Sequence, residues 1–322
     1  MTVVDKQYQY WSRGLDKKYE AEGHAPLDAC TRLVRDDYVK VAFSPKFKIA
    51  KNAKYFGIGS CFARNIETSL RDNGADVLSM DLELPEAAKE SIFYFQNEIM
   101  TKFTTHSMET ELKSAFSNLP LDQGFIQIKR PLVWNPQLHR GVQLPPNEQR
   151  ATAKAVRDTV LKVADADVVF ITLGLTETWI DIQTGTPLND APIDWRYAKK
   201  TGRFEFKNMT YEECKSSLLS ALHIIRTNSK RDVKFVLTVS PVPLLRTFSD
   251  QDIIVANSYS KGVLRAVAQQ LYTDYDDVDY FPSYEMVVNS PRHKAWRHDQ
   301  RHVVPDQVWA ITRQFREAYI KA

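Results

Sequence analysis

The sequence predicts an α/β fold in which helices cover both faces of a parallel sheet. Short apolar segments alternate with amphipathic segments along most of the chain, as they do where helices connect parallel strands. The two strongest apolar segments, 167–173 and 233–239, run almost without a polar interruption. A strand with one face in water would alternate, so these strands are expected to be buried on both sides.

The first strand is expected at residues 55–59, a short apolar run that ends in glycine. A helix follows at once, with Ala63, Ile66 and Leu70 on one face, and Gly74 ends it. The end of this strand therefore lies directly before a helix N-terminus.

The later elements follow from the same periodicities and from the positions of proline. Two insertions are expected, near 82–146 and 181–206. The first begins with helical pieces over 82–119 and continues as irregular β structure over 124–134, and the second is a long connection rich in Gly, Pro and Trp. The remaining predictions are helices at 150–164, 211–227, 258–272 and 305–319, and a last short strand at 278–281.

The chain is predicted to divide into an N-terminal extension, 1–48, and one domain, 49–322, that carries both insertions. The extension has no clear period, but its aromatic residues argue for an ordered segment packed on the core. These residues are Trp11, Tyr19 and Tyr38.

The composition is that of an ordinary globular protein. Of 322 residues, 43% are hydrophobic and 26% charged, and the net charge of +3 gives no argument for nucleic-acid binding. The cysteines, Cys30, Cys61 and Cys214, are odd in number and far apart, which excludes a full disulfide framework and points to a reducing compartment. No secretory signal and no apolar run of membrane-spanning length is found, so a soluble, cytoplasmic protein is expected.

The first candidate site residue is Ser60, in the stretch Gly57-Ile58-Gly59-Ser60-Cys61-Phe62-Ala63. A serine between a parallel strand and a helix lies at the carboxyl edge of the sheet, beside the first amides of the helix. Those amides can stabilise an oxyanion, so Ser60 is a candidate nucleophile. A serine there could also be only the N-cap of the helix, and one residue can do both.

The second candidate is the pair of Asp299 and His302, just before the last predicted helix. An aspartate three residues before a histidine can orient the imidazole and stabilise it when it takes up a proton. The pair could also be part of a surface charge cluster, which includes Arg292, His293, Arg297, His298 and Arg301. A metal site made of His293, His298, Asp299 and His302 is a further alternative, which the neighbouring prolines and arginines disfavour.

Three more polar clusters follow predicted strands. After 167–173 come Gly174, Thr176 and Glu177, which could contact substrate or an oxyanion, unless Thr176 is a helix cap. Ser240 follows the next strand, and Tyr284 and Glu285 follow the last one, where a packed tyrosine is the commoner outcome. The convergence of these clusters on one sheet edge is the main argument for a site there.

In this order, the clusters resemble the GSCFA family, whose signature stands here as Gly59-Ser60-Cys61-Phe62-Ala63. Further matching stretches are GLTETW, TYEEC, TVSPVPL, ANSYSKGVLRA, DYFPSYE and RHV, from about residue 51 to the last helix. The family looks like a branch of the SGNH (GDSL-like) hydrolases. The resemblance implies a flavodoxin-like three-layer α/β/α sandwich of the SGNH-hydrolase type, with Ser60 as nucleophile, His302 as general base and Asp299 as its partner.

The sequence departs from the SGNH pattern in the third block, where a Gly-x-Asn-Asp would place an asparagine in the oxyanion hole. Here Gly174-Leu175-Thr176-Glu177 stands in its place. Thr176 could still donate a hydrogen bond, whereas an ionised Glu177 would repel an oxyanion unless it is turned away. The glycine of the second block has no evident counterpart, although Asn97 or the pair Thr104-Thr105 could replace it.

The predicted function is therefore that of a serine esterase that removes a short acyl group, O-acetyl first, from a carbohydrate. Ser60 attacks the ester, and its amide, the helix terminus and Thr176 stabilise the oxyanion; no cofactor or metal is needed. Aromatic residues near Trp134, Trp179 and Trp195 could stack on sugar rings. The alternatives are an O-acyltransferase with a glycan hydroxyl as acceptor, and a noncatalytic glycan-binding or scaffold protein. The oligomeric state is not predicted.

Overall fold

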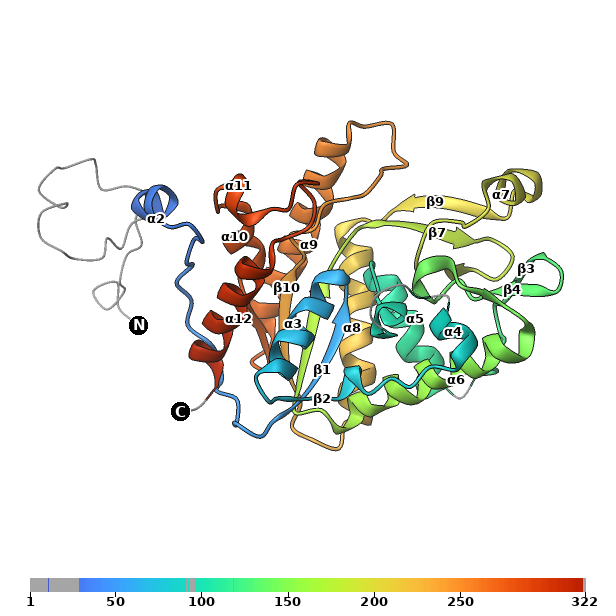
Figure 1. The fold of residues 1–322 in the computed structure, drawn as a ribbon, viewed down its shortest axis with the longest axis horizontal. Helices are drawn as coiled ribbons and strands as arrows, with labels where there is room; N and C mark the ends of the chain where they lie inside the picture. Colours follow the sequence, from blue (N-terminus) through green and yellow to red (C-terminus); the bar gives the residue numbers. More distant parts are fainter. Residues whose placement is uncertain (1–10, 12–28, 91, 93–95, 118, 321–322) are drawn as a thin grey trace, which may run out of the picture.

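The architecture is built on one five-stranded parallel sheet, seen in a computed structural model that describes residues 11, 29–90, 92, 96–117 and 119–320 (Figure 1). Its strands are β1 (Lys54–Gly59), β2 (Asp76–Val77), β6 (Val168–Leu173), β10 (Lys234–Val239) and β11 (Val278–Tyr280). They lie in the order β2-β1-β6-β10-β11, which is the doubly wound order of flavodoxin-like sheets. The four predicted strands are confirmed, and β2 is an addition.

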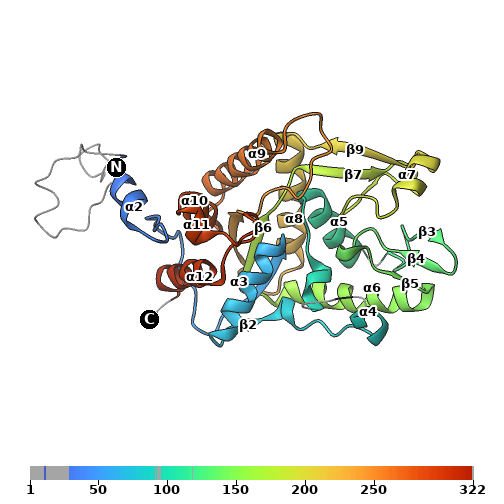
Figure 2. The ribbon, with the colours of Figure 1, turned by 45° about the horizontal axis from the view of Figure 1, so that its top comes forward.

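Each strand alternates its buried side chains between two helical layers. Phe170 faces the layer of α3 (Cys61–Asp72), α10 (Ser283–Val288) and α12 (Pro305–Tyr319). Its neighbours Val169 and Ile171 face the layer that contains α6 (Pro146–Leu161), α8 (Tyr211–Asn228) and α9 (Ile253–Asp274). Burial on both faces explains why these strands read as continuous apolar runs, and it makes the fold a three-layer α/β/α sandwich (Figure 2).

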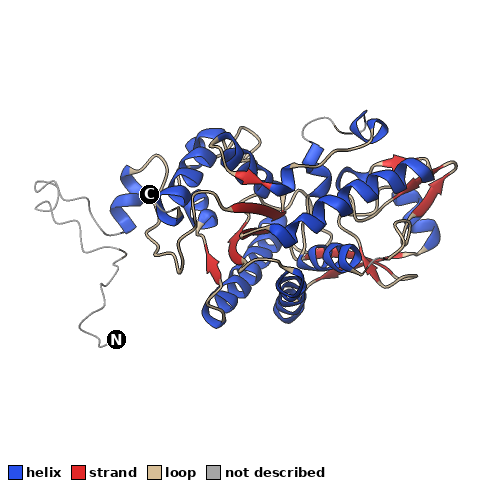
Figure 3. Ribbon diagram, turned by 90° about the horizontal axis from the view of Figure 1, so that it is seen from below, coloured by secondary structure: helices blue, strands red, loops and turns tan. Residues whose placement is uncertain are grey.

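The described parts of both insertions lie at the end of the molecule away from α12 in Figure 1, and Figure 3 shows strands at the end opposite the C-terminus. The first contains α4 (Glu86–Glu90), η3 (Gln96–Met100), α5 (Thr105–Phe116), β3 (Ile126–Lys129), β4 (Leu132–Trp134), η4 (His139–Gly141) and β5 (Gln143–Leu144). The second contains β7 (Glu177–Asp181), β8 (Thr186–Pro187), α7 (Trp195–Thr201) and β9 (Phe204–Asn208). Each makes a three-stranded antiparallel sheet, and Trp134 of one packs with Leu188 of the other.

The alternative of a helix after Gly174, with Thr176 as its cap, is wrong. Residues Glu177–Asp181 form β7, which pairs along its whole length with β9. Local preference for a cap is overridden here by pairing with a strand further along the chain, since Glu177 lies opposite Asn208, 31 residues away.

The described part of the N-terminal extension runs from α2 (Ala29–Arg35) along the α12 side of the core. The amides of Val39 and Lys46 donate to the side chains of Ser290 and Asp279, both at 2.8 Å. Of the three aromatic residues expected to pack, Tyr38 is half-buried, Trp11 is 72% exposed, and Tyr19 lies outside the described residues.

Across the described ranges, no helix combines the length and the apolar character that crossing a bilayer requires.

Candidate functional site

Ser60 occupies the N-cap position of α3, directly after β1, as expected. Its hydroxyl does not cap the helix, however, and Oγ has no hydrogen-bond partner among the described residues, although Ser60 is only 3% exposed. Buried hydroxyls nearly always find a partner. A buried free hydroxyl at the point where the strand order reverses, between β1 and β6, is therefore the feature around which a site can be built.

Two glycines allow the backbone to close around Ser60. Gly59 has a φ of +135°, and a Cβ there would lie 2.3 Å from the carbonyl oxygen of Thr172 on β6. A Cβ on Gly174 would lie 2.7 Å from the carbonyl oxygen of Phe103 and 3.2 Å from Cβ of Ser60. Gly174 thus lies directly against Ser60, and neither position has room for a larger residue.

The segment 101–103, which joins η3 to α5, lies beside these two glycines. The amide of Lys102 donates to the carbonyl of Gly59 at 2.8 Å, and the amide of Leu175 donates to that of Phe103 at 2.8 Å. The side chain of Asn189 holds both ends of this segment. It accepts a hydrogen bond from the amide of Phe103 at 3.3 Å and donates one to the carbonyl of Thr101 at 2.7 Å. No sequence signal pointed to Asn189, since its partners lie more than 80 residues away.

The residues considered as substitutes for the missing second-block glycine are engaged elsewhere. Asn97 donates to the buried carboxylate of Glu67 at 3.0 Å. Thr104 is the N-cap of α5, and the hydroxyl of Thr105 bonds that of Ser217 at 2.6 Å.

Asp299 and His302 form a hydrogen-bonded pair in the loop between α11 (Arg292–Ala295) and α12. Oδ2 of Asp299 lies 2.5 Å from Nδ1 of His302, and Oδ1 accepts from the amides of Arg301 and His302, both at 3.0 Å. These bonds, the amide of His302 first, hold the pKa of Asp299 well below its usual range. The ionised carboxylate fixes the proton on Nδ1 and leaves Nε2 as the basic nitrogen.

Nε2 of His302 faces the guanidinium of Arg301, whose Nη1 lies 3.3 Å away. Nε of Arg301 in turn donates to the carbonyl of Pro243 at 3.3 Å, in the loop after β10. Ser60 and His302 are therefore not hydrogen-bonded to each other in this structure. Catalytic hydrogen bonds often close only when substrate binds.

The metal alternative finds no support in the geometry. Residues 298–302 form a loop, so the spacing of His298 and His302 does not place them on one helical face. Within the ranges that the structure describes, no three His, Cys, Asp or Glu side chains are grouped as metal ligands would be.

Thr176 and Glu177 are held by other parts of the chain. The hydroxyl of Thr176 donates to Asn208 on β9 at 2.7 Å. The carboxylate of Glu177 accepts from the hydroxyl of Thr247 at 2.5 Å and from the amide of Phe248 at 3.0 Å. Glu177 thus anchors the loop after β10, and both side chains have partners other than Ser60.

The last two candidates differ in their surroundings. Ser240 is 1% exposed, and within the part of the chain that the structure describes its hydroxyl has no partner, like that of Ser60. Its amide donates to the carbonyl of Leu173 on β6 at 2.8 Å. Tyr284 is half-buried against the core, and burial raises its pKa. The adjacent Glu285 bonds Arg265 and Tyr280, so this cluster is internally paired.

Lys261 on α9, which is 2% exposed, was not predicted from the sequence as a candidate site residue. Its Nζ donates to the carbonyls of Gly174 and Val242 at 2.7 and 2.8 Å. Burial lowers the pKa of this amine to about 7. The residue stands in the stretch ANSYSKGVLRA, between Ser260 and Gly262, where no apolar pattern marks it as buried.

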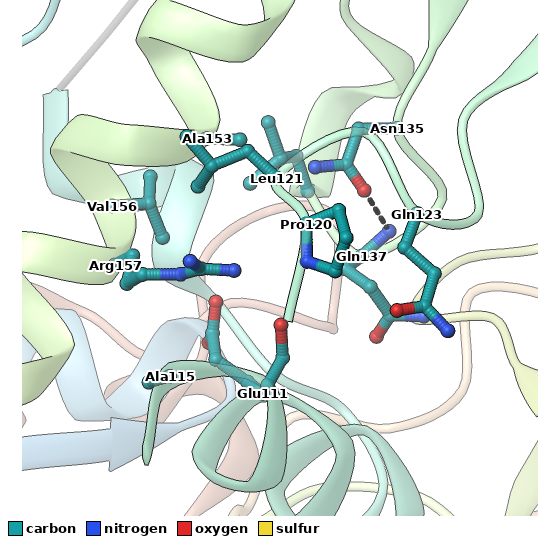
Figure 4. A pocket seen from close by; sticks show the side chains of 12 residues that line it. Glu111, Ala115, Pro120, Leu121, Gln123, Asn135, Gln137, Ala153, Val156 and Arg157 are labelled. Carbon is teal, nitrogen blue, oxygen red and sulfur yellow. Dashed lines mark hydrogen bonds between the residues drawn. The ribbon is translucent and has the colours of Figure 1, made fainter. Parts of the chain in front are cut away.

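A cavity lies away from these residues, among α5, α6 and the segments that flank β3 and β4 (Figure 4). It is lined by Glu111, Ser114, Ala115, Pro120, Leu121, Gln123, Asn135, Gln137, Leu138, Ala153, Val156 and Arg157. None of the predicted site residues lines it. The candidate site at the switch point of the sheet is therefore separate from this cavity.

The strand order defines an α/β protein of the doubly wound class, and Ser60 lies at the switch point of its sheet. Within that class the chain belongs to the GSCFA family, because the model of that family matches residues 54–315, most of the chain. Membership suggests a hydrolase-like function. A search of curated proteins finds no match.

Proposed function

We propose that this protein is a serine esterase of the SGNH type that removes a short acyl group, O-acetyl first, from a carbohydrate. The observation that carries the proposal is the buried, unpartnered hydroxyl of Ser60 at the sheet's switch point. A hydroxyl with no partner in the resting protein is available to a base and to an acyl carbon.

In this mechanism Nε2 of His302 takes the proton of Ser60 as Oγ attacks the ester carbonyl. Asp299 holds the imidazole in the required tautomer and stabilises the imidazolium. Collapse of the tetrahedral intermediate expels the sugar oxygen, which takes the proton back from His302. Water then attacks the acyl-serine by the same route and releases the acid. For Oγ to reach Nε2, Arg301 has to give up its contact with that nitrogen.

Of the oxyanion groups that the sequence suggested, only the helix terminus and Gly174 are kept in this proposal. The amide of Ser60 already donates to the carbonyl of Thr172 at 3.1 Å, and the hydroxyl of Thr176 donates to Asn208. In the described part of the chain, the amides of Cys61 and Gly174 donate to no other residue. We assign the oxyanion hole to these two amides, one in the first turn of α3 and one beside Ser60.

A carbohydrate substrate is supported by the aromatic residues of the second insertion. Trp195 is 44% exposed and packs edge-on against Trp179, with ring centroids 5.4 Å apart. An exposed ring held by a second ring is a suitable platform for a sugar. Trp134 is 1% exposed and belongs to the core, so it has no such role.

The first test uses p-nitrophenyl acetate and a fluorophosphonate probe with wild type and Ser60→Ala. We expect turnover and a label on Ser60 in the wild type, and neither in the variant. If both proteins are equally inert and unlabelled, the esterase proposal fails.

Acyl transfer is the second candidate, favoured by the burial of Ser60, because exclusion of water protects an acyl-enzyme. Acyl transfer in place of hydrolysis would appear as turnover that requires an added sugar.

A further inference from the structure

Lys261 is an unusual residue to find inside this sheet edge. An ammonium group that leaves water needs compensation, and here two backbone carbonyls supply it. The ionisable groups that face it are the thiol of Cys61 on α3 and the guanidinium of Arg301 in the loop before α12, and neither is a carboxylate. An apolar side chain would fill the same space at lower cost, so the amine calls for an explanation beyond packing.

The two carbonyls belong to the two loops that form the site. Gly174 directly follows β6 and lies against Ser60, so closely that a Cβ on the glycine would be 3.2 Å from Cβ of the serine. Val242 lies in the loop after β10 and is followed by Pro243, whose carbonyl accepts from Arg301. Arg301 in turn contacts Nε2 of His302. One amine thus connects the serine side of the site with the histidine side.

We propose that Lys261 is a positioning residue that sets the distance between Ser60 and His302 by holding the carbonyls of Gly174 and Val242. The proposal rests on the serine esterase function above. Lys261 touches neither substrate nor the reacting atoms, and it acts through the two loops. The ammonium form holds them more strongly than the neutral amine does, because charge-assisted hydrogen bonds are about twice as strong as neutral ones.

The test compares wild type with Lys261→Met, which keeps the length of the side chain and removes its donors. The matched control is Lys46→Met, because Lys46 also donates to two backbone carbonyls, those of Tyr272 and Tyr275, at the other end of α9. Thermal melts and circular dichroism establish that each variant is folded. Lys261→Arg, which keeps a charged donor, serves as the rescue.

The first readout does not depend on activity. Amide hydrogen exchange in the segments 174–176 and 242–244 is measured at Leu175, Thr176 and Leu244, whose amides are hydrogen-bonded. It should quicken by about tenfold in Lys261→Met, since hydrogen bonds to a charged donor contribute on that scale. Lys46→Met should leave both segments unchanged. Unchanged exchange in Lys261→Met would overturn the proposal at its first step.

The second readout is the rate at which the fluorophosphonate probe labels Ser60, together with kcat and KM for p-nitrophenyl acetate. We expect kcat and labelling to fall by on the order of 10²-fold in Lys261→Met with little change in KM, as a displacement of about 1 Å can cause. Lys261→Arg should recover part of the rate. In wild type the rate should also decline above about pH 7, as Lys261 loses its proton, and Lys261→Met should lack this decline.

Loosened loops with an unchanged labelling rate would overturn the positioning role. If wild-type Ser60 takes no label at any pH, the esterase function itself fails. The exchange data then still decide whether Lys261 tethers the two loops.

Discussion

The guanidinium of Arg301 lies 3.3 Å from Nε2 of His302, the nitrogen proposed to take the proton of Ser60. Substitution of Arg301 by Gln should free that nitrogen while keeping a polar side chain. Removal of one hydrogen bond of about 1 kcal/mol corresponds to about a fivefold faster labelling of Ser60. Arg297→Gln, a nearby exposed arginine, is the control. Slower labelling in Arg301→Gln would show instead that the charge supports the reaction.

Asp299→Asn should lower kcat by on the order of 10³-fold, because the amide can no longer hold the proton on Nδ1 of His302. The hydrogen bonds that lower the pKa of Asp299 keep its carboxylate charged down to pH values well below the usual carboxyl range. Its contribution to stability is therefore present above the ordinary carboxyl pKa and is lost only as the pH falls toward the lowered folded value. A kcat that is unchanged in the asparagine variant would exclude the pair from the mechanism.

Gly174→Ala should impair Ser60 specifically, since the new methyl group would meet both Phe103 and Ser60. We expect a loss of about 1–3 kcal/mol in the free energy of unfolding from overpacking, with a larger proportional loss of probe labelling. Gly262→Ala is the matched control, because that glycine lies in α9 with open space around it. It should stabilise the protein by about 0.5–1 kcal/mol. Equal effects of the two substitutions would argue against a close approach at Gly174.

Trp195→Ala should raise KM for an acetylated oligosaccharide by about tenfold and leave hydrolysis of p-nitrophenyl acetate unchanged, if the exposed ring is a sugar platform. Trp309→Ala is the control, since Trp309 is similarly exposed, at 53%, but lies on α12. Comparable KM values for all three proteins would remove the argument for a carbohydrate.

The central strands could be predicted from the sequence because a strand that is buried on both faces has a continuous apolar run of residues. The sequence could not predict β2, since two residues carry no period. It also did not predict β7. Thr176 and Glu177 are residue types typical of a helix N-terminus, and the segment is a strand because it pairs with β9. These are the elements whose conformation is decided by tertiary contacts.

The same distinction separates the candidate site residues that were predicted from those that were not. Ser60, Asp299 and His302 were predicted because each stands at a recognisable junction of strand, loop and helix. Lys261 and Asn189 were missed because their partners lie 19 to 88 residues away in the chain. Moreover, several of these partners are backbone carbonyls, which every residue has, so the sequence does not show which of them accept a hydrogen bond. Buried polar side chains that hold loops together thus become visible only in three dimensions.

The final prediction concerns Lys261: activity and stability should change in opposite directions as the pH rises. Its pKa is lowered by burial from 10.5 to about 7, so between these values the unfolded chain binds the proton more tightly than the folded protein. The free energy of unfolding should therefore rise with pH in this window, by at most about 1.4 kcal/mol per pH unit.

Lys261→Met removes the titrating group. Urea unfolding at about pH 6.5, 8 and 9.5 should then show wild type gaining stability relative to the methionine variant as the pH rises. Over the same range, the labelling of Ser60 should decline in wild type. A lysine that only supported the fold would let activity follow stability, whereas a positioning ammonium makes the two diverge. Parallel stability curves for the two proteins would show that Lys261 keeps its proton, and the alkaline loss of activity would then need another group.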